Sequence, residues 1–294
     1  MRTGCGFHGI RKQTLLSGVC GAALLLSLCF ATPASAQAVW TGATSSDWTD
    51  GSNWSTGTAP VAGQTVNIIA TSPNPTILGV GGPTNASVGG TTVGNAIGTN
   101  GNLTIQNGSS LTSTGTTRLG VTAGSNGLVT VTGPGSLWSI NTGTASIGFV
   151  GTGTLNIQNG GQVTTIGAMV LGGGVGSSGT LNISSGGTLQ ALSLRGGPGA
   201  SQANFDNGIL RATAANATFI NGFSGNELNL LAGGLTIHTG GFAVGTDAAS
   251  GFSGIGGLTV AGGGIFNLQA NSIYSGETQI DFGSSLALTG AGAV

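Results

Sequence analysis

The chain has 294 residues, of which 60 are glycine and 4% are charged, and its formal net charge at pH 7 is −1. Disorder requires low hydrophobicity together with high net charge; neither holds, because the mean hydropathy is +0.32 and Val, Leu and Ile recur at a fixed spacing. After position 36 the basic residues are Arg118, Arg195 and Arg211, which cannot form the basic stripe that nucleic-acid binding needs. The composition predicts an ordered, nearly uncharged protein that binds no nucleic acid.

Residues 1–36 have the pattern of a signal peptide. Three basic residues lie within the first 12 positions, an apolar run follows over Leu15–Phe30, and Ala-Ser-Ala at 34–36 supplies a small-residue cleavage site. The apolar run is too short for a stable membrane span. We therefore expect an exported mature chain that begins at Gln37.

The 3 cysteines of the protein all lie in this segment, so the mature chain carries neither a disulfide nor a thiolate metal site. Two explanations remain open. A chain without cysteine suits passage across an oxidising periplasm, and Gly/Thr-rich repeats also simply contain few cysteines.

Residues 37–70 form a tryptophan-rich segment that we interpret as an N-terminal cap. Three of the 4 tryptophans lie here: Trp40, Trp48 and Trp54. They could form an aromatic ligand site, for example for sugars, but the favoured interpretation is a cap over the exposed end of a stacked structure. Asp47, Asp50 and Asn53 suggest a cation-binding loop, although their spacing fits no EF-hand.

Residues 71–102 are predicted to form an irregular first coil. Pro73, Pro75 and Pro83 lie in this segment, and proline keeps a strand out of the centre of a sheet because it cannot donate a ladder hydrogen bond.

Residues 103–206 contain a regular repeat. Similar tripeptides begin at 103, 129, 155 and 181, so each step is 26 residues. A second apolar position follows eight residues after each start, at Leu111, Leu137, Val163 and Leu189. A third apolar position follows at Leu119, Ile147, Leu171 and, less regularly, Leu194.

This repeat predicts a right-handed parallel β-helix, that is, a solenoid of three-strand coils with about 26 residues per coil. Apolar and polar residues alternate within each short strand, and Gly, Asn and Ser separate the strands as corners. A unit of this length cannot bury its own apolar face and must stack on its neighbours. Outward threonines are expected to form rows across the strands, and stacked asparagines to form ladders inside or at corners.

Residues 207–294 lose the period but keep short strand-like pieces set off by glycine, and they are expected to form less regular coils with an open end at Val294. An exposed sheet edge pairs with other chains. We therefore expect the isolated mature chain to aggregate.

The repeat units resemble a known group of proteins. The units at 129–138 and 155–163 resemble the repeats of type V secretion (autotransporter) and PEP-CTERM-type surface proteins, and the tryptophan-rich start is similar to that of such passengers. The segments at 205–212, 257–260 and 274–280 resemble autotransporter-associated β-strand repeats. Together the resemblance covers nearly all of residues 38–294.

The resemblance implies that the chain is a passenger, displayed at the cell surface, held at the outer membrane or released as an extracellular protein after export through an outer-membrane β-barrel translocator. Such a barrel needs at least eight strands of about ten residues with alternating apolar positions, and the sequence contains no such region. We therefore expect one of two arrangements. Either the chain is a truncated fragment and the translocator is encoded downstream of it, or the chain is secreted without a translocator of its own.

The sequence supplies no candidate for a catalytic, cofactor-binding or metal-binding residue. His238 is the one histidine after position 36, no Gly-x-Ser-x-Gly motif follows position 36, and alternation places His238 on an exposed strand face. Glycoside hydrolysis needs two neighbouring carboxylates, and no two acidic residues are one 26-residue coil apart. Arg118 and Arg195 are interpreted as solvated residues at strand ends.

The resulting hypothesis is an exported, non-enzymatic structural or adhesive stalk that recognises a ligand on a host or neighbouring cell. The alternatives are a polysaccharide-active β-helix enzyme and an inert spacer fragment.

Overall fold

The computed structural model describes residues 37–69 and 73–294, and the predicted signal peptide, residues 1–36, lies outside them. The described residues fall within one compact unit, Ser35–Val294. Apart from the short 3-10 helix η1 (Gly51–Asn53), the elements in this part of the chain are all strands. None of the helical structure described there meets the length and apolarity that a membrane span requires.

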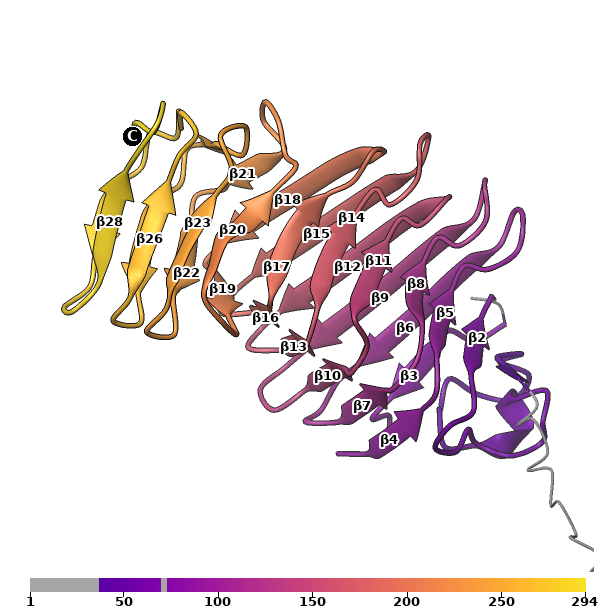
Figure 1. Ribbon diagram of the computed structural model, residues 1–294. Helices are drawn as coiled ribbons and strands as arrows, with labels where there is room; N and C mark the ends of the chain where they lie inside the picture. The colour runs from indigo at the N-terminus through magenta and orange to yellow at the C-terminus, as the bar shows by residue number, and fades with distance from the viewer. Residues whose placement is uncertain (1–36, 70–72) are drawn as a thin grey trace, which may run out of the picture. The chain divides into compact units, whose positions relative to one another are not determined.

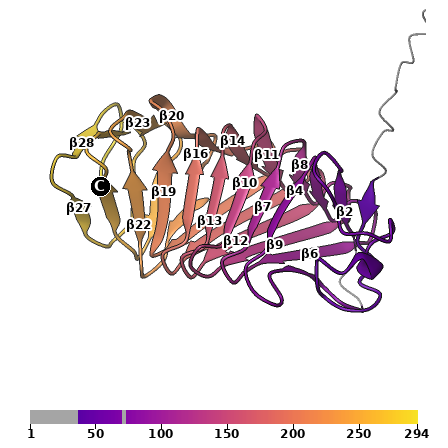
Figure 2. The same ribbon diagram turned by 90° about the horizontal axis from the view of Figure 1, so that it is seen from below.

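The chain winds through three parallel sheets, contributing one strand to each sheet per coil, as Figures 1 and 2 show. The predicted parallel β-helix of three-strand coils is thereby confirmed, with about 9 turns of about 25 residues. Parallel pairing follows from this path, because the chain returns to a given sheet only after passing through the other two.

Within each sheet, neighbouring strands come from successive coils and follow one another along the solenoid. The first sheet contains β1 (Ala38–Val39), β2 (Val66–Ile68), β5 (Thr91–Val93), β8 (Thr117–Leu119), β11 (Thr144–Ile147), β14 (Ala168–Leu171), β17 (Ser193–Gly196), β20 (Asn216–Asn221), β23 (Ala243–Thr246), β26 (Ile265–Leu268) and β28 (Ser285–Leu288). The second sheet contains β4 (Asn85–Val88), β7 (Ser110–Ser113), β10 (Leu137–Ile140), β13 (Gln162–Thr165), β16 (Thr188–Ala191), β19 (Gly208–Ala212), β22 (Leu235–His238), β25 (Leu258–Ala261) and β27 (Thr278–Ile280). The third sheet contains β3 (Thr76–Leu78), β6 (Asn100–Ile105), β9 (Asn126–Thr132), β12 (Thr152–Gln158), β15 (Ser178–Ser184), β18 (Ala200–Asp206), β21 (Leu228–Leu230) and β24 (Phe252–Gly254).

The 26-residue step of the sequence corresponds to one turn of the solenoid. The first apolar residue of each repeat pairs in register with its equivalent in the third sheet, and all four are 0% exposed: Leu103, Val129, Leu155 and Leu181. Full burial of such a side chain stabilises the fold by about 1.5–3 kcal/mol. The next coil is shorter, because Leu181 pairs with Ala203, 22 residues further on.

The second apolar position was predicted wrongly in one repeat. Trp138, not Leu137, pairs in register with Leu111 and Val163, and its side chain is 0% exposed. The reason is the corner before β10, which contains Pro134. Trp138 follows Val131 by seven positions, whereas Leu111 follows Ile105 and Val163 follows Ile157 by six. Since a shift of one residue moves a strand side chain to the opposite face, Leu137 turns outward.

The third apolar position also differs in its last member. Leu194 pairs in register with Met169, whereas Gly196 pairs with Leu171. Leu194 is nevertheless 0% exposed, so it is a core residue in a different row.

The segment 71–102 contains β3, β4 and β5, which pair in register with β6, β7 and β8. β3 and β4 are the terminal strands of their sheets. Pro75 directly precedes β3, and Pro83 lies just before β4. This placement agrees with the confinement of proline to edge strands and strand starts.

The corners between strands depend on positive backbone φ angles. In the turn between the third and second sheets, Asn159 and Gly160 have φ values of 54° and 76°, which asparagine and glycine tolerate better than other residues. In the turn from the first sheet to the third, Gly148 has a φ of 73° and lies against the backbone of Ser178 in the next coil.

The core is open to solvent at the last coil. Ile280 pairs in register with Val260, and Leu288 pairs with Leu268. The two partners are 0% exposed, whereas Ile280 is 49% and Leu288 48% exposed. The inward side chains of the final coil are therefore covered on one side only.

Candidate functional site

The tryptophans of the N-terminal segment form a buried cluster. The ring centroids of Trp40 and Trp54 are 5.0 Å apart and those of Trp48 and Trp54 are 4.8 Å apart, both in edge-to-face geometry. Trp40 donates its indole N–H to the carbonyl of Asn74, and Trp54 donates its own to the carbonyl of Trp48. All three side chains are at most 2% exposed, so the rings fill the core and offer no face to a sugar.

The same segment covers a sheet edge, as a cap must. The backbone N–H of Trp48 donates to the carbonyl of Ile77 in the terminal strand β3, and the N–H of Ile77 donates to the carbonyl of Ser46. The side chain of Asn53, 0% exposed, accepts hydrogen bonds from the backbone of Thr44 and Ser45 and so holds this segment in place.

The suggested cation loop is a hydrogen-bond network. Hydrogen bonds from the Ser52 hydroxyl and then the Thr44 hydroxyl lower the pKa of Asp50 from its ordinary value of 3.8. Asp50 also accepts from the backbone N–H of Ser52 and thereby caps the N-terminus of η1. Across residues 37–69 and 73–294 there is no group of three or more His, Cys, Asp and Glu side chains that could hold a metal ion.

Three other carboxylates stabilise corners. Asp206 accepts a hydrogen bond from the N–H of Gly233, and Glu227 accepts one from that of Ser224. Asp247 accepts from two backbone N–H groups of its own loop and from the N–H of Gly222 in the preceding coil. Burial opposes ionisation of Asp247, but the hydrogen bonds outweigh it and its pKa is lowered. In register, Asp206 lies beside Ser184, so it has no carboxylate partner there.

His238 and the two repeat arginines lie on outward strand faces. His238 is half-buried in β22, and its Nδ1 accepts the N–H of Gly240 at 3.2 Å. Arg118 is not at a strand end as predicted: it occupies the middle of β8, with its guanidinium carbon 3.9 Å from the ring centroid of Phe149. Arg195 is exposed, as predicted.

Asparagines form a ladder along the outward face of the third sheet, not inside the solenoid or at its corners. The ladder begins at Thr130 and continues through Asn156, Asn182, Asn204 and Asn229. At each step an amide nitrogen donates to the oxygen of the preceding residue, at 3.4, 2.8, 2.9 and 3.4 Å. The result is a continuous row of neutral hydrogen-bonding groups.

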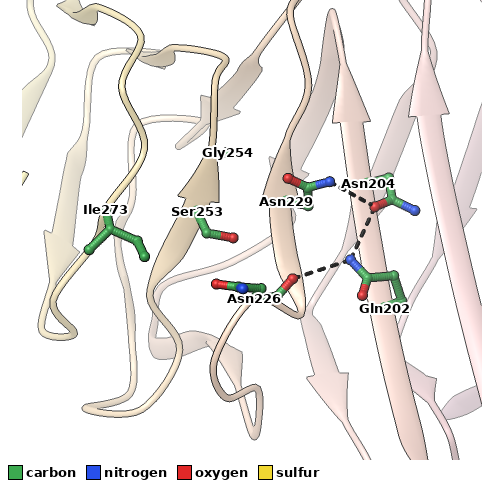
Figure 3. A pocket seen from close by; sticks show the side chains of 7 residues that line it. All are labelled: Gln202, Asn204, Asn226, Asn229, Ser253, Gly254 and Ile273. Carbon is green, nitrogen blue, oxygen red and sulfur yellow. Dashed lines mark hydrogen bonds between the residues drawn. The ribbon is translucent and has the colours of Figure 1, made fainter.

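A shallow groove of about 560 Å³ lies where this ladder ends. Figure 3 shows its lining side chains, which come from β18, the turn before β21, β21 itself, β24 and the segment after β26: Gln202, Asn204, Asn226, Asn229, Ser253 and Ile273. The small Ser253 follows Asn229 in register, and Ile273 extends the sheet by donating its N–H to the carbonyl of Phe252. The groove is thus a place where a small residue interrupts the outward row.

A second cavity of about 340 Å³ lies at the corner between the third and second sheets. Its polar lining includes Asn207, Thr236, Thr259 and Gln279, with Glu277 as the carboxylate. A single carboxylate does not supply the pair that glycoside hydrolysis needs.

Sequence reasoning missed the groove. Asn182, Asn204 and Asn229 are separated by 22 and 25 residues, so a search at the 26-residue step does not connect them. The available signal is local, since each precedes an apolar residue within a short strand.

Comparison with known proteins gives no further guide: no protein-family model matches the chain, and neither the curated proteins nor the solved structures compared yielded a match.

Proposed function

We propose that the chain is the passenger of an autotransporter-like protein and acts at the cell surface as a non-catalytic, adhesive β-helical stalk. The observation that carries this proposal is the uninterrupted ladder of neutral side chains on the outward face of the third sheet, from Thr130 to Asn229. Such rows offer a regular hydrogen-bonding surface and stabilise neighbouring coils without charge.

The fold supports the stalk part of the proposal. Each coil of a solenoid contacts its neighbours alone, so length increases with the number of coils while the cross-section stays constant. The signal-peptide pattern and the resemblance of the repeats support export, with an outer-membrane β-barrel translocator as the proposed partner and a host or neighbouring cell as the source of the ligand. The hydrogen bonds of Asp206, Glu227 and Asp247 to backbone N–H groups support a structural role for the carboxylates.

The test has two parts. In producing cells, the exported protein should begin at Gln37 and should be degraded by protease added to intact cells. Deletion of the gene should then reduce attachment or clumping. An intact Met1 on exported protein would overturn the export step, and unchanged attachment would favour the inert spacer.

Removal of one coil distinguishes the role of the stalk's length from the role of its adhesive surface. Thr152 and Ser178 occupy equivalent positions in β12 and β15, so deleting residues 152–177 joins β11 to β15 without changing the register. The shortened protein should remain exported and adhesive. Cleavage of a glycan by the purified protein would instead favour the enzymatic alternative.

A further inference from the structure

The groove at the end of the asparagine ladder has unused hydrogen-bonding capacity. Gln202 donates through Nε2 to Oδ1 of Asn204 at 3.0 Å and to the backbone carbonyl of Asn226 at 3.3 Å, as Figure 3 shows. Asn229 donates through Nδ2 to Asn204 at 3.4 Å. Among the described residues, Gln202 Oε1, Asn229 Oδ1 and the whole side-chain amide of Asn226 have no protein partner.

This arrangement differs from the rest of the ladder. Asn182 both donates to Asn156 and accepts from Asn204, so its amide is engaged on two sides. Asn229 donates within the ladder but accepts no hydrogen bond from the next coil, because Ser253 follows it in register and donates instead to the carbonyl of Leu228. The end of the ladder therefore leaves acceptors and donors directed at one groove.

The chemistry of these groups selects a class of ligand. A primary amide both donates and accepts hydrogen bonds and carries no charge, and neighbouring sugar hydroxyls have the same dual character. Ile273, 67% exposed, adds an apolar surface suited to the C–H face of a sugar ring. The volume of about 560 Å³ lies within the range of small-molecule sites.

Other ligand classes fit less well. The lining contains no Lys, Arg or His to attract a phosphate or a carboxylate. A peptide that adds a strand needs an unpaired sheet edge, whereas β18 and β21 are hydrogen-bonded in register to neighbouring strands on both sides.

We propose that this groove binds a neutral oligosaccharide through the amides of Gln202, Asn226 and Asn229, with Ile273 packed against a sugar ring. The inference rests on the proposed adhesive function, to which it adds the class of ligand. Gln202 lies in β18 and Asn229 in the neighbouring strand β21, and neighbouring strands are about 4.8 Å apart, so one sugar unit can contact both amides.

The experiment measures glycan binding by the purified full chain. The probes are neutral glucan, galactan and mannan oligosaccharides of three to six sugars, with oligogalacturonides of equal length as the charged counterpart. Microarray binding is followed by titration calorimetry on the best probe. We expect saturable binding of at least one neutral probe and weaker or no binding of the charged ones.

The variants locate the binding. Asn226→Ala removes a side chain with no protein partner and should weaken binding about three- to tenfold, the loss expected for one or two neutral hydrogen bonds. Asn226→Ala combined with Asn229→Ala should weaken it further. Asn141→Ala is the matched control, because Asn141 is also exposed, its side chain has no protein partner among the described residues, and it lies outside both the ladder and the groove. This variant should bind as the unaltered protein does.

Three results would overturn the inference: no neutral probe binds, the charged probes bind best, or Asn141→Ala weakens binding as much as Asn226→Ala. Cell attachment that persists while all neutral probes fail would reject this ligand class and leave the adhesive function standing. Glycan binding by a protein that is never exported would reject the adhesive function instead.

Discussion

Two glycines of the same kind of corner should respond differently to alanine. Gly148 and Gly176 both have positive φ, 73° and 80°, and both lie between a strand of the first sheet and one of the third. A Cβ on Gly148 would overlap the backbone carbonyl of Ser178 in the next coil, whereas a Cβ on Gly176 meets no atom within 4 Å.

The magnitudes follow from these two surroundings. An alanine forced into the left-handed region costs about 1–2 kcal/mol, and this is the whole effect expected for Gly176→Ala. In Gly148→Ala the neighbouring coil must also move, and such overpacking typically adds about 1–3 kcal/mol. The expected losses of unfolding free energy are therefore about 1–2 kcal/mol for Gly176→Ala and about 2–5 kcal/mol for Gly148→Ala.

Urea unfolding followed by far-ultraviolet circular dichroism measures both values on the full chain, with the m-value checked for constancy. Because solenoids unfold as coupled coils, hydrogen exchange of β12 and β15 should show the local opening caused by Gly148→Ala. If Gly176→Ala proves equally or more destabilising, contact between coils does not explain the glycine at 148, and the reasoning is refuted.

Five further substitutions test the core, the cap and the open end. Trp138→Ala should lose about 3–5 kcal/mol of unfolding free energy and Leu137→Ala at most about 1 kcal/mol; equal losses would contradict the one-residue shift. The hydroxyl of Thr76 is buried without a hydrogen-bond partner among the described residues, so Thr76→Val should stabilise by about 1–2 kcal/mol in the same urea assay. The folded-state pKa of Asp50 lies below 3.8, so the ionised carboxylate stabilises the fold above that pH, and this stabilisation is lost as the pH falls through the lowered pKa. The melting temperature of Asp50→Asn should therefore decline less than that of the unaltered protein between about pH 5 and pH 2. Ile280→Lys places a charge on the open end and should reduce self-association in analytical ultracentrifugation, and undiminished aggregation would point to another surface.

The fold could be predicted because the repeat length and the coil length are the same quantity. Leu103, Val129, Leu155 and Leu181 become neighbours through the 26-residue step alone, and burial of one strand face fixes their register. The failure at Trp138 shows the limit of this reasoning. One extra residue at a corner leaves the 26-residue step between repeat starts unchanged, but it exchanges the inward and outward faces of the strand that follows.

The N-terminal cap was predicted because three tryptophans close together have few ways to be buried at a solenoid end. The hydrogen bonds that hold the cap could not be predicted from the sequence. Asn53 accepts them from the backbone N–H groups of Thr44 and Ser45, and no periodic pattern indicates that the backbone brings these residues together. The same holds for Arg118, whose position over Phe149 depends on the conformation of a corner.

The groove lies where the 26-residue period is lost, and the change in coil length explains both the loss of the period and the position of the groove. In the regular repeats each outward asparagine is engaged by its neighbours, so a ligand there must compete with protein hydrogen bonds. In the later coils the steps shorten to 22 and 25 residues, and Ser253 follows Asn229 in the outward row of side chains. The ladder therefore ends with free amide groups beside the groove. Departures from local regularity are expected where a surface is shaped for binding. The regular coils therefore serve as the support, and the irregular coils carry the candidate site.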